Sequence, residues 1–339
     1  PPPLVSLLTT IQSMLSCSKE IKDNKLFVYE TDRNIKKYTI TCCPGSNGLP
    51  LFRLKDWSKK LLQKNSRVNK GNYGQVLFDT YDGVSFNELV SFLSSRPPNY
   101  DSIKNKAVGR KCALSRRHSL NPEATTTLFP SSSTLNLIDN GIWPTWFESN
   151  GKGKGRLYTP LANQGTLNLE SRLSCNDFIA LRRTLILSIN FCANHNIVHL
   201  DIKKDNMLNH NGNFFLSDFG SSQTTGSYMN FKIKSNHPSY PPEFYKKRSK
   251  VSAAQDLWRA GYLLLEASTV NFDQNFTNAY NALLVSSLEY STPNWIKRIN
   301  SLLTDHPYLD NTDIQLIQIL LTPCPCERLK EYESFTSKR

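Results

Sequence analysis

Three polar side chains lie close together in the sequence, at the edges of apolar segments that are expected to be buried. Asp201 and Asn206 are five residues apart, and Asp218 follows twelve residues later, all within the stretch NIVHLDIKKDNMLNHNGNFFLSDFG (196–220). Burying a carboxylate without a partner is costly. This cluster therefore predicts that a positively charged group lies among the three side chains.

The residues between Asn206 and Asp218 are expected to form a hairpin. Asn-Gly-Asn (211–213) lies between the apolar runs NML and FFL, and Asn-Gly favours a tight hairpin turn. A hairpin returns its ends to one place, so Asn206 and Asp218 should lie side by side with Asp201 nearby. A hard cation such as Mg²⁺ takes oxygen ligands in such an arrangement and keeps positions for water and phosphate oxygens. Such a metal would supply the missing positive charge.

The same residues resemble the catalytic core of eukaryotic-type protein kinases. His-x-Asp-x-Lys-x-x-Asn followed by Asp-Phe-Gly is similar to the motifs of that family. The resemblance implies a base that positions the substrate hydroxyl, a group that neutralises charge on the γ-phosphoryl group, and two Mg²⁺ ligands, which would be Asp201, Lys203, Asn206 and Asp218 in turn. A Lys two residues after the Asp is more typical of Ser/Thr kinases than of Tyr kinases.

Three further motifs follow in the order of this family: YPPEF (240–244), DLWRAG (256–261) and LLTPCPCERL (320–329). The first resembles the A-P-E that closes the activation segment, and the second resembles the start of the central buried helix. The resemblance implies that Asp256 hydrogen-bonds the catalytic-loop backbone and that Glu243 forms a structural ion pair with Arg328. The resemblance covers about residues 68–330.

The glycine-rich loop of the family is matched less completely. VNKGNYGQV (68–76) follows G-x-G-x-x-G-x-V with Asn in the first Gly place. The resemblance implies that this loop covers the ATP phosphates, and that the backbone of the LYTPLANQGTL segment hydrogen-bonds adenine. The implied nucleotide-binding residues are Asn69, Gly71, Tyr73, Gly74, Val76, Lys111, Pro160 and Ala162.

The lysine that the family carries on its third strand has two candidates. Lys111 fits by alternation, because Gly109 and Lys111 would face the nucleotide together. It lies 40 residues after Gly71, which requires an insert, and we expect that insert at 84–103. Lys106 is the rival, and either could instead be a surface lysine.

The acidic partner of that lysine is also open. Glu123 follows Lys111 by only 12 residues, a shorter distance than usual, and Pro122 precedes it. We therefore expect Glu123 to lie on an exposed loop.

The usual His-Arg-Asp of the family is His199-Leu200-Asp201 here. No Arg at this position can receive a phosphate from the activation segment, which predicts activity without that phosphorylation. The segment between Asp-Phe-Gly and Pro-Pro-Glu contains Thr224, Thr225, Ser227 and Tyr228, so modification stays open.

The wider pattern predicts an N-terminal part rich in strands and a C-terminal part rich in helices. Residues 1–65 include the strand-like runs KLFVYE and KYTITCC, whereas 119–136 is rich in Ser, Thr and Pro and is expected to be a loop. Helices are expected at FNELVSFLSS, and at 253–268, where apolar residues on nearly every face indicate burial. A further amphipathic helix is expected where apolar residues recur at 178, 181, 185 and 189, and Asn176 or Asp177 could cap its start.

We therefore expect an α+β, bilobal, protein-kinase-like fold with the ATP site between a β-rich N-lobe and an α-helical C-lobe. Residues 1–65 would be an N-terminal extension of unknown role. The kinase domain would span 66–335, with the N-lobe at about 66–160 and the C-lobe at about 161–335.

Composition indicates a globular chain. Of 339 residues, 39% are hydrophobic and 20% are charged, and no apolar run approaches the roughly 18 residues of a membrane span. The first residues lack a basic region typical of a secretory signal. The eight cysteines are scattered without CxxC pairs, so we expect free thiols in a reducing compartment and an intracellular protein, cytoplasmic or nuclear.

The formal net charge is +13, with basic residues gathered in 104–117, 152–156 and 246–250. These are either solvated surfaces or sites that attract acidic or phosphorylated partners. Zinc-finger, basic-zipper and RNP-type signatures do not accompany them, so nucleic acid is not expected as the main ligand. Lys232, Lys234 and 246–250, near the activation segment, favour protein substrates with acidic or phospho-primed sites.

Three functions are consistent with these residues. The leading one is a Mg-ATP-dependent Ser/Thr protein kinase. A pseudokinase scaffold is the alternative, because the first Gly is replaced and the lysine and its glutamate are ambiguous. A small-molecule kinase of related fold is the third, although such enzymes usually lack Asp-Phe-Gly followed by Pro-Pro-Glu. HLDI and PPE also resemble, faintly, kinases of large DNA viruses, herpesvirus-type ones included, which would imply nuclear action in a host cell.

Overall fold

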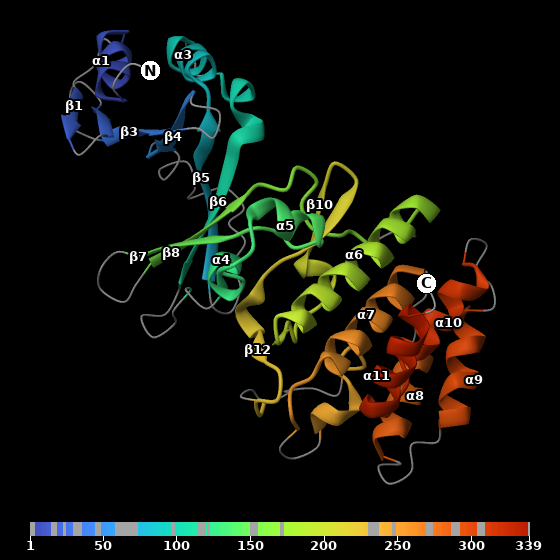
Figure 1. Cartoon of the computed structure of the whole chain (residues 1–339). Helices are drawn as coiled ribbons and strands as arrows, with labels where there is room; N and C mark the ends of the chain where they lie inside the picture. The colour runs from blue at the N-terminus through green and yellow to red at the C-terminus, as the bar shows by residue number, and fades with distance from the viewer. Residues whose placement is uncertain are drawn as a thin grey trace. The chain divides into compact units, whose positions relative to one another are not determined.

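A computed structural model gives the structure of the chain (Figure 1). It describes residues 4–14, 19–22, 25–29, 36–44, 49–57, 74–95, 99–113, 120, 123–149, 155–169, 173–229, 237–245, 249–268, 274–285, 292–303 and 309–337. The chain divides into two compact units. The first holds Pro1–Ala124 and Thr145–Leu161, and the second holds Thr125–Pro144 and Ala162–Arg339.

The first unit is built on one antiparallel sheet with the strand order β1-β2-β3-β4-β5-β6-β8-β7. Its strands are β1 (Lys19–Lys22), β2 (Lys25–Tyr29), β3 (Lys36–Pro44), β4 (Pro50–Asp56), β5 (Gly74–Val84), β6 (Ala107–Ala113), β7 (Trp146–Ser149) and β8 (Gly155–Pro160). The strand-like runs predicted near the N-terminus are β2 and β3. Strands β1–β4 belong to the same sheet as β5–β8. The predicted boundary between an N-terminal extension and the kinase domain stays a prediction.

The core of this unit follows from the alternation of its strands. Leu26, Ile40 and Leu54 are buried on one face of the sheet, together with Leu8 of α1 (Leu4–Met14) and Phe92 of α3 (Phe86–Ser94). Side chains alternate between the two faces of a strand, so one face is apolar and the other is partly exposed.

The predicted short helix in FNELVSFLSS is α3, and a capping box between Ser85 and Glu88 fixes its start. Two short 3₁₀ turns follow it, η1 (Tyr100–Ser102) and η2 (Lys104–Lys106). The segment 84–103, which was expected to be an insert, thus holds α3 and η1 between β5 and β6.

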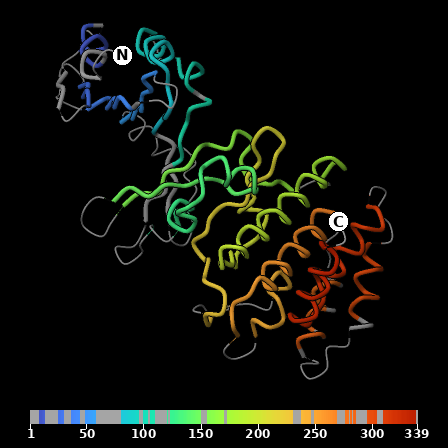
Figure 2. The backbone as a smooth tube through the Cα atoms, viewed as in Figure 1, coloured from blue at the N-terminus to red at the C-terminus, as the bar shows by residue number. Residues whose placement is uncertain are grey.

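The second unit is mainly helical. Its helices are α4 (Thr125–Leu128), α5 (Thr134–Asp139), α6 (Cys175–Asn194), α7 (Ala253–Ser268), α8 (Gln274–Val285), α9 (Thr292–Leu303), α10 (Asn311–Leu320) and α11 (Pro325–Thr336). Its short strands form two pairs, β9 (Ile197–Val198) with β12 (Gln223–Thr224) and β10 (Met207–His210) with β11 (Asn213–Leu216). Figure 2 shows the helices from α7 to α11 gathered at the C-terminal end of the chain.

Helix α7 is the centre of this unit, as its apolar composition predicts. Every residue from Ala254 to Leu265 is buried, and the ring of Trp258 stacks on that of Trp295 in α9. The predicted loop at 119–136 is wrong in part, because α4 and the start of α5 lie there. Phe129 of that segment and Leu137, just after it, are buried in the core, and such packing outweighs the weak helix propensity of Ser and Thr.

The predicted cap of α6 is also wrong. Ser174 is the N-cap, with extended backbone, and its Oγ accepts a hydrogen bond from the N–H of Asp177. Asp177 is already in the first helical turn. The predicted apolar stripe is confirmed, because Phe178, Leu181, Leu185 and Ile189 are all buried.

Two expectations from composition can be compared with the described residues. Within the ranges given above, no helix has both the length and the hydropathy that a membrane span requires. The cysteines whose side chains are described carry free thiols, as expected: Cys42, Cys43, Cys175, Cys192, Cys324 and Cys326.

Candidate active site

The predicted hairpin is present and brings the chain on either side of it together. Strands β10 and β11 pair from Met207 opposite Leu216 to His210 opposite Asn213. The turn has positive φ at Asn211 (54°) and Gly212 (76°), which is the conformation of a type I′ turn. At the base of the hairpin, the N–H of Ser217 donates to the carbonyl of Asn206 at 2.8 Å.

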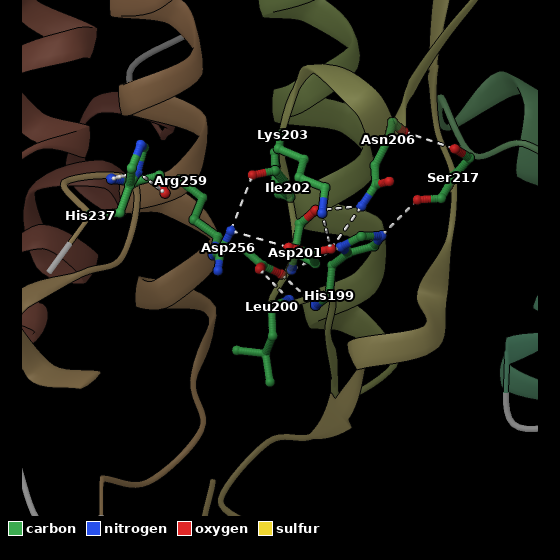
Figure 3. A network of polar contacts seen from close by, with 11 residues as sticks. His199, Leu200, Asp201, Ile202, Lys203, Asn206, Ser217, His237, Asp256 and Arg259 are labelled. Atoms are coloured by element: carbon green, nitrogen blue, oxygen red, sulfur yellow. Dashed lines mark hydrogen bonds and ion pairs between the residues drawn. The ribbon is translucent and has the colours of Figure 1, made fainter. Parts of the chain in front are cut away.

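Asp201 lies on the loop before this hairpin, and two donors contact Oδ2 of its carboxylate (Figure 3). The Nζ of Lys203 is 2.8 Å from Oδ2 of Asp201. The Nδ2 of Asn206 donates to the same Oδ2 at 3.0 Å and to the carbonyl of Asp201 at 2.8 Å. The loop therefore brings together three of the four residues predicted to act on phosphate, substrate and metal.

Asp256 of α7 forms hydrogen bonds with the backbone of this loop, as the family resemblance implies. Its carboxylate accepts hydrogen bonds from the N–H groups of His199 at 2.6 Å and Leu200 at 2.8 Å. The N–H of Asp201 donates to Nδ1 of His199, whose Nε2 lies 3.0 Å from the carbonyl of Ser217. The ring thus carries its proton on Nε2.

Burial shifts the pKa values of His199 and Asp256 in the directions that favour their neutral forms. Burial lowers the pKa of His199, against the opposing effect of the carboxylates of Asp256 and Asp201. Burial likewise raises the pKa of Asp256, against the opposing effects of His199 and the two N–H donors.

Leu200 adopts a left-handed backbone, with φ of 64°. Its side chain is buried in a small apolar cluster with Val198, Phe244 and Val251. A left-handed leucine costs roughly 1–2 kcal/mol, and the hydrogen bond from its N–H to Asp256 helps to offset this. Figure 3 shows the Leu200 side chain turned away from the polar network.

Asp218 lies just beyond the hairpin, before η5 (Phe219–Ser221), and also has a left-handed backbone, with φ of 59°. Its side chain is exposed, whereas Phe219 is buried against the ring of His199.

The metal-binding prediction can be tested against the donors that these residues offer. Among the described residues, no group of three His, Cys, Asp or Glu side chains could hold a metal by itself. Asn206 and Asp218 together offer one amide oxygen and one carboxylate. Because Nδ2 of Asn206 is bonded to Asp201, its Oδ1 is the atom available to a cation. This small oxygen set fits a hard cation that keeps most of its positions for water and phosphate oxygens.

The predicted ion pair between Glu243 and Arg328 is confirmed. Nη1 of Arg328, in α11, is 2.8 Å from Oε1 of Glu243 in η6 (Pro242–Tyr245), and both side chains are buried. The same guanidinium donates to the carbonyls of Ala254, Thr322 and Pro323. This pair is structural, because it touches none of the groups around Asp201.

The predicted nucleotide-binding residues are only partly described. Asn69, Gly71 and Tyr73 lie outside the described residues. Gly74 begins β5, and Val76 pairs with Lys111 of β6, which also lies opposite Leu157 of β8. Pro160 ends β8, and Ala162 is buried just after it. Their roles stay predictions.

The expectation that Glu123 is exposed is wrong. Only 4% of this residue is exposed. Its neighbours Leu120 and Ala124 pack against Leu157, which draws Glu123 into the interior of the first unit despite Pro122. A buried carboxylate requires a partner, so Glu123 has a place in the fold that its sequence position did not indicate.

Arg259 of α7 is a residue that the sequence did not single out. Its Nη1 is 3.4 Å from Oδ1 of Asp201 and 3.5 Å from the carbonyl of Ile202. Only 3% of its side chain is exposed. The sequence signal that could have identified it is its charge, because Arg259 lies in the 253–268 helix that was expected to be buried on nearly every face.

Comparison with known proteins agrees with this geometry. Residues 156–337 match the protein kinase domain family, which is just over half of the chain. CBL-interacting serine/threonine-protein kinase 20 of Arabidopsis thaliana is 29% identical over 133 residues, 36% of this chain and 30% of that protein. CBL-interacting protein kinase 8 of Oryza sativa is 28% identical over 183 residues, 52% of this chain and 36% of that protein.

A third relative is the SNF1-like protein kinase ssp2 of Schizosaccharomyces pombe, which is 28% identical over 152 residues, 43% of this chain and 23% of that protein. The chain therefore spans roughly a third or less of the length of these relatives. They are plant and yeast proteins, and the faint likeness to viral kinases stays a prediction.

Proposed function

The chain belongs to the protein kinase family, and from this premise we propose that it transfers the γ-phosphate of Mg-ATP to serine or threonine hydroxyls of proteins. The observation that carries the proposal is the loop around Asp201, where Lys203 and Asn206 contact the same carboxylate oxygen at 2.8 and 3.0 Å. The names of the relatives support the choice of serine and threonine.

Asp201 would orient the acceptor hydroxyl and take its proton as the oxygen attacks the γ-phosphorus and the bond to the ADP oxygen breaks. Lys203, whose side chain is 45% exposed, would contact the γ-phosphoryl oxygens. Asn206 and Asp218 would hold Mg²⁺, which neutralises phosphate charge when bound. Asn206 also keeps the Asp201 carboxylate in place through Nδ2.

Lys111 is our choice for the lysine that contacts the ATP phosphates, with Glu123 as its partner. Lys111 lies directly opposite Leu157 in the sheet, and Leu157 packs against the residues that flank Glu123. The rival, Lys106, lies in η2 close enough to Glu88 of α3 to help lower the pKa of that carboxyl, against the larger opposing effect of burial. Lys106 therefore lies between the expected insert and β6, with its charge near α3.

Activity would not require phosphorylation of the activation segment. The support is Leu200, which occupies the usual Arg position and packs with Phe244 and Val251, both of which follow the Pro-Pro-Glu sequence. Apolar packing would then hold the segment where other kinases use a phosphate and an arginine. Phosphatase treatment of the purified protein should leave the transfer rate within about two-fold, and a larger loss would overturn this part of the proposal.

We propose acidic or phospho-primed serines as the preferred sites, because of the positive charge near the activation segment. Of that charge, Lys250 lies among the described residues. A peptide panel tests this: turnover should rise when acidic residues surround the target serine, whereas a preference for basic peptides would contradict it. We also propose that the protein acts in the cytoplasm or nucleus.

The proposed function is tested by identifying the product and the lysine together. The wild type should form phosphoserine or phosphothreonine in a protein acceptor, and Lys111→Met should reduce the rate by about 100-fold or more. Lys106→Met is the matched control and should keep the wild-type rate. A phosphorylated small molecule as the product would favour a small-molecule kinase. Folded wild-type protein that binds ATP without transfer would favour a scaffold.

A further inference from the structure

Arg259 is a buried charge in α7, a helix of the second unit whose residues are nearly all buried. The residues around it in α7 are buried from Ala254 to Leu265, and only 3% of the Arg259 side chain is exposed. Burying a guanidinium is costly unless it is paired and hydrogen-bonded. The contacts of this side chain therefore indicate what it does.

Those contacts are too weak to make Arg259 a good stabilising residue. Its distances to Oδ1 of Asp201 and to the carbonyl of Ile202 are 3.4 and 3.5 Å, longer than a normal charge-assisted hydrogen bond. Its Nε is buried, and no residue in the described part of the chain gives it a hydrogen-bond partner. A buried ion pair of this quality adds little stability compared with an apolar side chain of similar size.

The position of Arg259 beside Asp201 is complementary to that of the other donors (Figure 3). Lys203 and Asn206 contact Oδ2 of the carboxylate, whereas Arg259 contacts Oδ1 from α7. Each carboxylate oxygen of Asp201 thus has a donor on its own side. Rotation of the carboxylate would break contacts at both oxygens.

The same guanidinium also reaches the segment that precedes Glu243. Its carbon lies 4.6 Å from the ring centroid of Tyr240, within the range of a cation–π contact. The hydroxyl of Tyr280 donates a hydrogen bond to the carbonyl of Tyr240. In the same segment, Nε1 of Trp258, next to Arg259, donates to the carbonyl of Pro238 at 2.9 Å. One side chain thus contacts the loop of Asp201 and the 237–245 segment.

We propose that Arg259 is a positioning residue for phosphoryl transfer, which fixes the orientation of the Asp201 carboxylate and couples it to the 237–245 segment through Tyr240. The proposal rests on the proposed kinase function. It deepens that function, because it makes the geometry of the base depend on the segment that closes the activation region.

The variant Arg259→Met separates this role from a structural one. Methionine keeps much of the volume and removes the charge, a change that is often neutral or stabilising for a weakly paired buried charge. We expect kcat to fall about 10- to 100-fold, since a small misplacement of a reacting group costs rates of this order. The KM for ATP and the midpoint of thermal unfolding should stay near the wild-type values. Wild-type kcat in this variant would overturn the proposal.

Lys204→Met is the matched control. Nζ of Lys204 is 3.1 Å from Oε1 of Glu266, so this ion pair also joins the catalytic loop to α7, but it does not touch Asp201. The control should keep the wild-type kcat. An equal loss in both variants would mean that any link between the loop and α7 matters, and it would contradict a specific role for Arg259.

Coupling to Tyr240 is tested by a double-mutant cycle. Tyr240→Leu removes the ring and should lower kcat, whereas Tyr240→Phe keeps the ring and should not. If Arg259 and Tyr240 act together, the variant with Arg259→Met and Tyr240→Leu should be no slower than the slower single variant. Multiplying effects would overturn the coupling.

Hydrogen exchange keeps failure of this inference distinct from failure of the proposed function. Arg259→Met should speed amide exchange in 237–245 and in the loop 199–206, while exchange in the middle of α7 stays unchanged. This readout does not need activity. If the wild type transfers no phosphate, both the kinase proposal and the positioning role fail. Hydrogen exchange then still shows whether Arg259 connects the Asp201 loop to the 237–245 segment. Unchanged exchange in both segments would overturn the link even in an active kinase.

Discussion

At the residue scale, the backbone around Asp201 is held by groups that are themselves buried. Asp256 accepts from the N–H groups of His199 and Leu200, and the His199 ring joins the N–H of Asp201 to the carbonyl of Ser217. This arrangement works only while Nδ1 of His199 carries no proton, because it accepts a hydrogen bond there. The neutral ring is therefore part of the site.

A dependence of stability on pH follows from this. Burial lowers the pKa of His199 below its ordinary value of about 6.5. Below about pH 6.5, the unfolded chain therefore binds a proton at this residue more readily than the folded chain does. The free energy of unfolding contributed by this residue is fully present above about pH 6.5 and declines as the pH falls below it. Urea unfolding at pH 7.5 and 5.5 should show a larger loss of stability for the wild type than for His199→Gln. Equal losses would contradict this.

What the sequence could predict at this scale depended on distance along the chain. Asp201, Asn206 and Asp218 could be brought together because one short hairpin sets their positions. The contacts of Arg259 and the burial of Glu123 could not be predicted, since each depends on residues far away in the sequence.

At the element scale, α7 and α10 approach closely at Gly261. A Cβ added there would lie 2.7 Å from Cβ of Leu320 and 3.0 Å from Cγ of Leu321. Such distances are shorter than van der Waals contact, so glycine is needed here for space. The backbone conformation of this residue does not require it.

Gly261→Ala should therefore destabilise the protein. Alanine favours a helix over glycine by about 1 kcal/mol, but overpacking in a core typically costs about 1–3 kcal/mol. We expect a net loss, measured as a lower urea midpoint with an unchanged m value. A midpoint above that of the wild type would show that the two helices can separate at little cost.

Elements with strong local signals were predicted well, and the others were not. The β10–β11 turn, the apolar stripe of α6 and the burial of α7 follow from short-range patterns. Helices α4 and α5 were missed, because their Ser- and Thr-rich sequence favours a loop and tertiary packing decides. The cap of α6 was misplaced by two or three residues, since several polar residues precede that helix.

At the scale of the whole molecule, the order of the strands is the feature that the sequence predicted least. The strands follow the chain order from β1 to β6, but at the other edge β8 lies between β6 and β7, and no local motif specifies that pairing. The helical unit was easier to predict, because its family motifs fix several long-range contacts at once. The Glu243–Arg328 pair is one of these, linking residues 85 positions apart.

Breaking this pair should destabilise the helical unit. Arg328→Met leaves the Glu243 carboxylate buried without its counter-charge, which typically costs about 3–5 kcal/mol. The matched control combines Glu243→Gln with Arg328→Met, removes both charges and should lose clearly less stability. Chemical unfolding of the three proteins measures both effects. If the double variant were as unstable as the single one, the loss would come from packing, and the unpaired charge would not explain it.

The rate of γ-phosphate transfer from Mg-ATP by the wild type and by Asp201→Asn tests the central claim most directly. Asparagine keeps the shape of the side chain and removes its ability to accept a proton. We predict transfer by the wild type and a loss of about 100- to 10,000-fold in the variant, with ATP affinity kept within about two-fold because the proposed base is not a nucleotide ligand. Equal rates for the two proteins, or no transfer by folded wild type that binds ATP, would contradict the account.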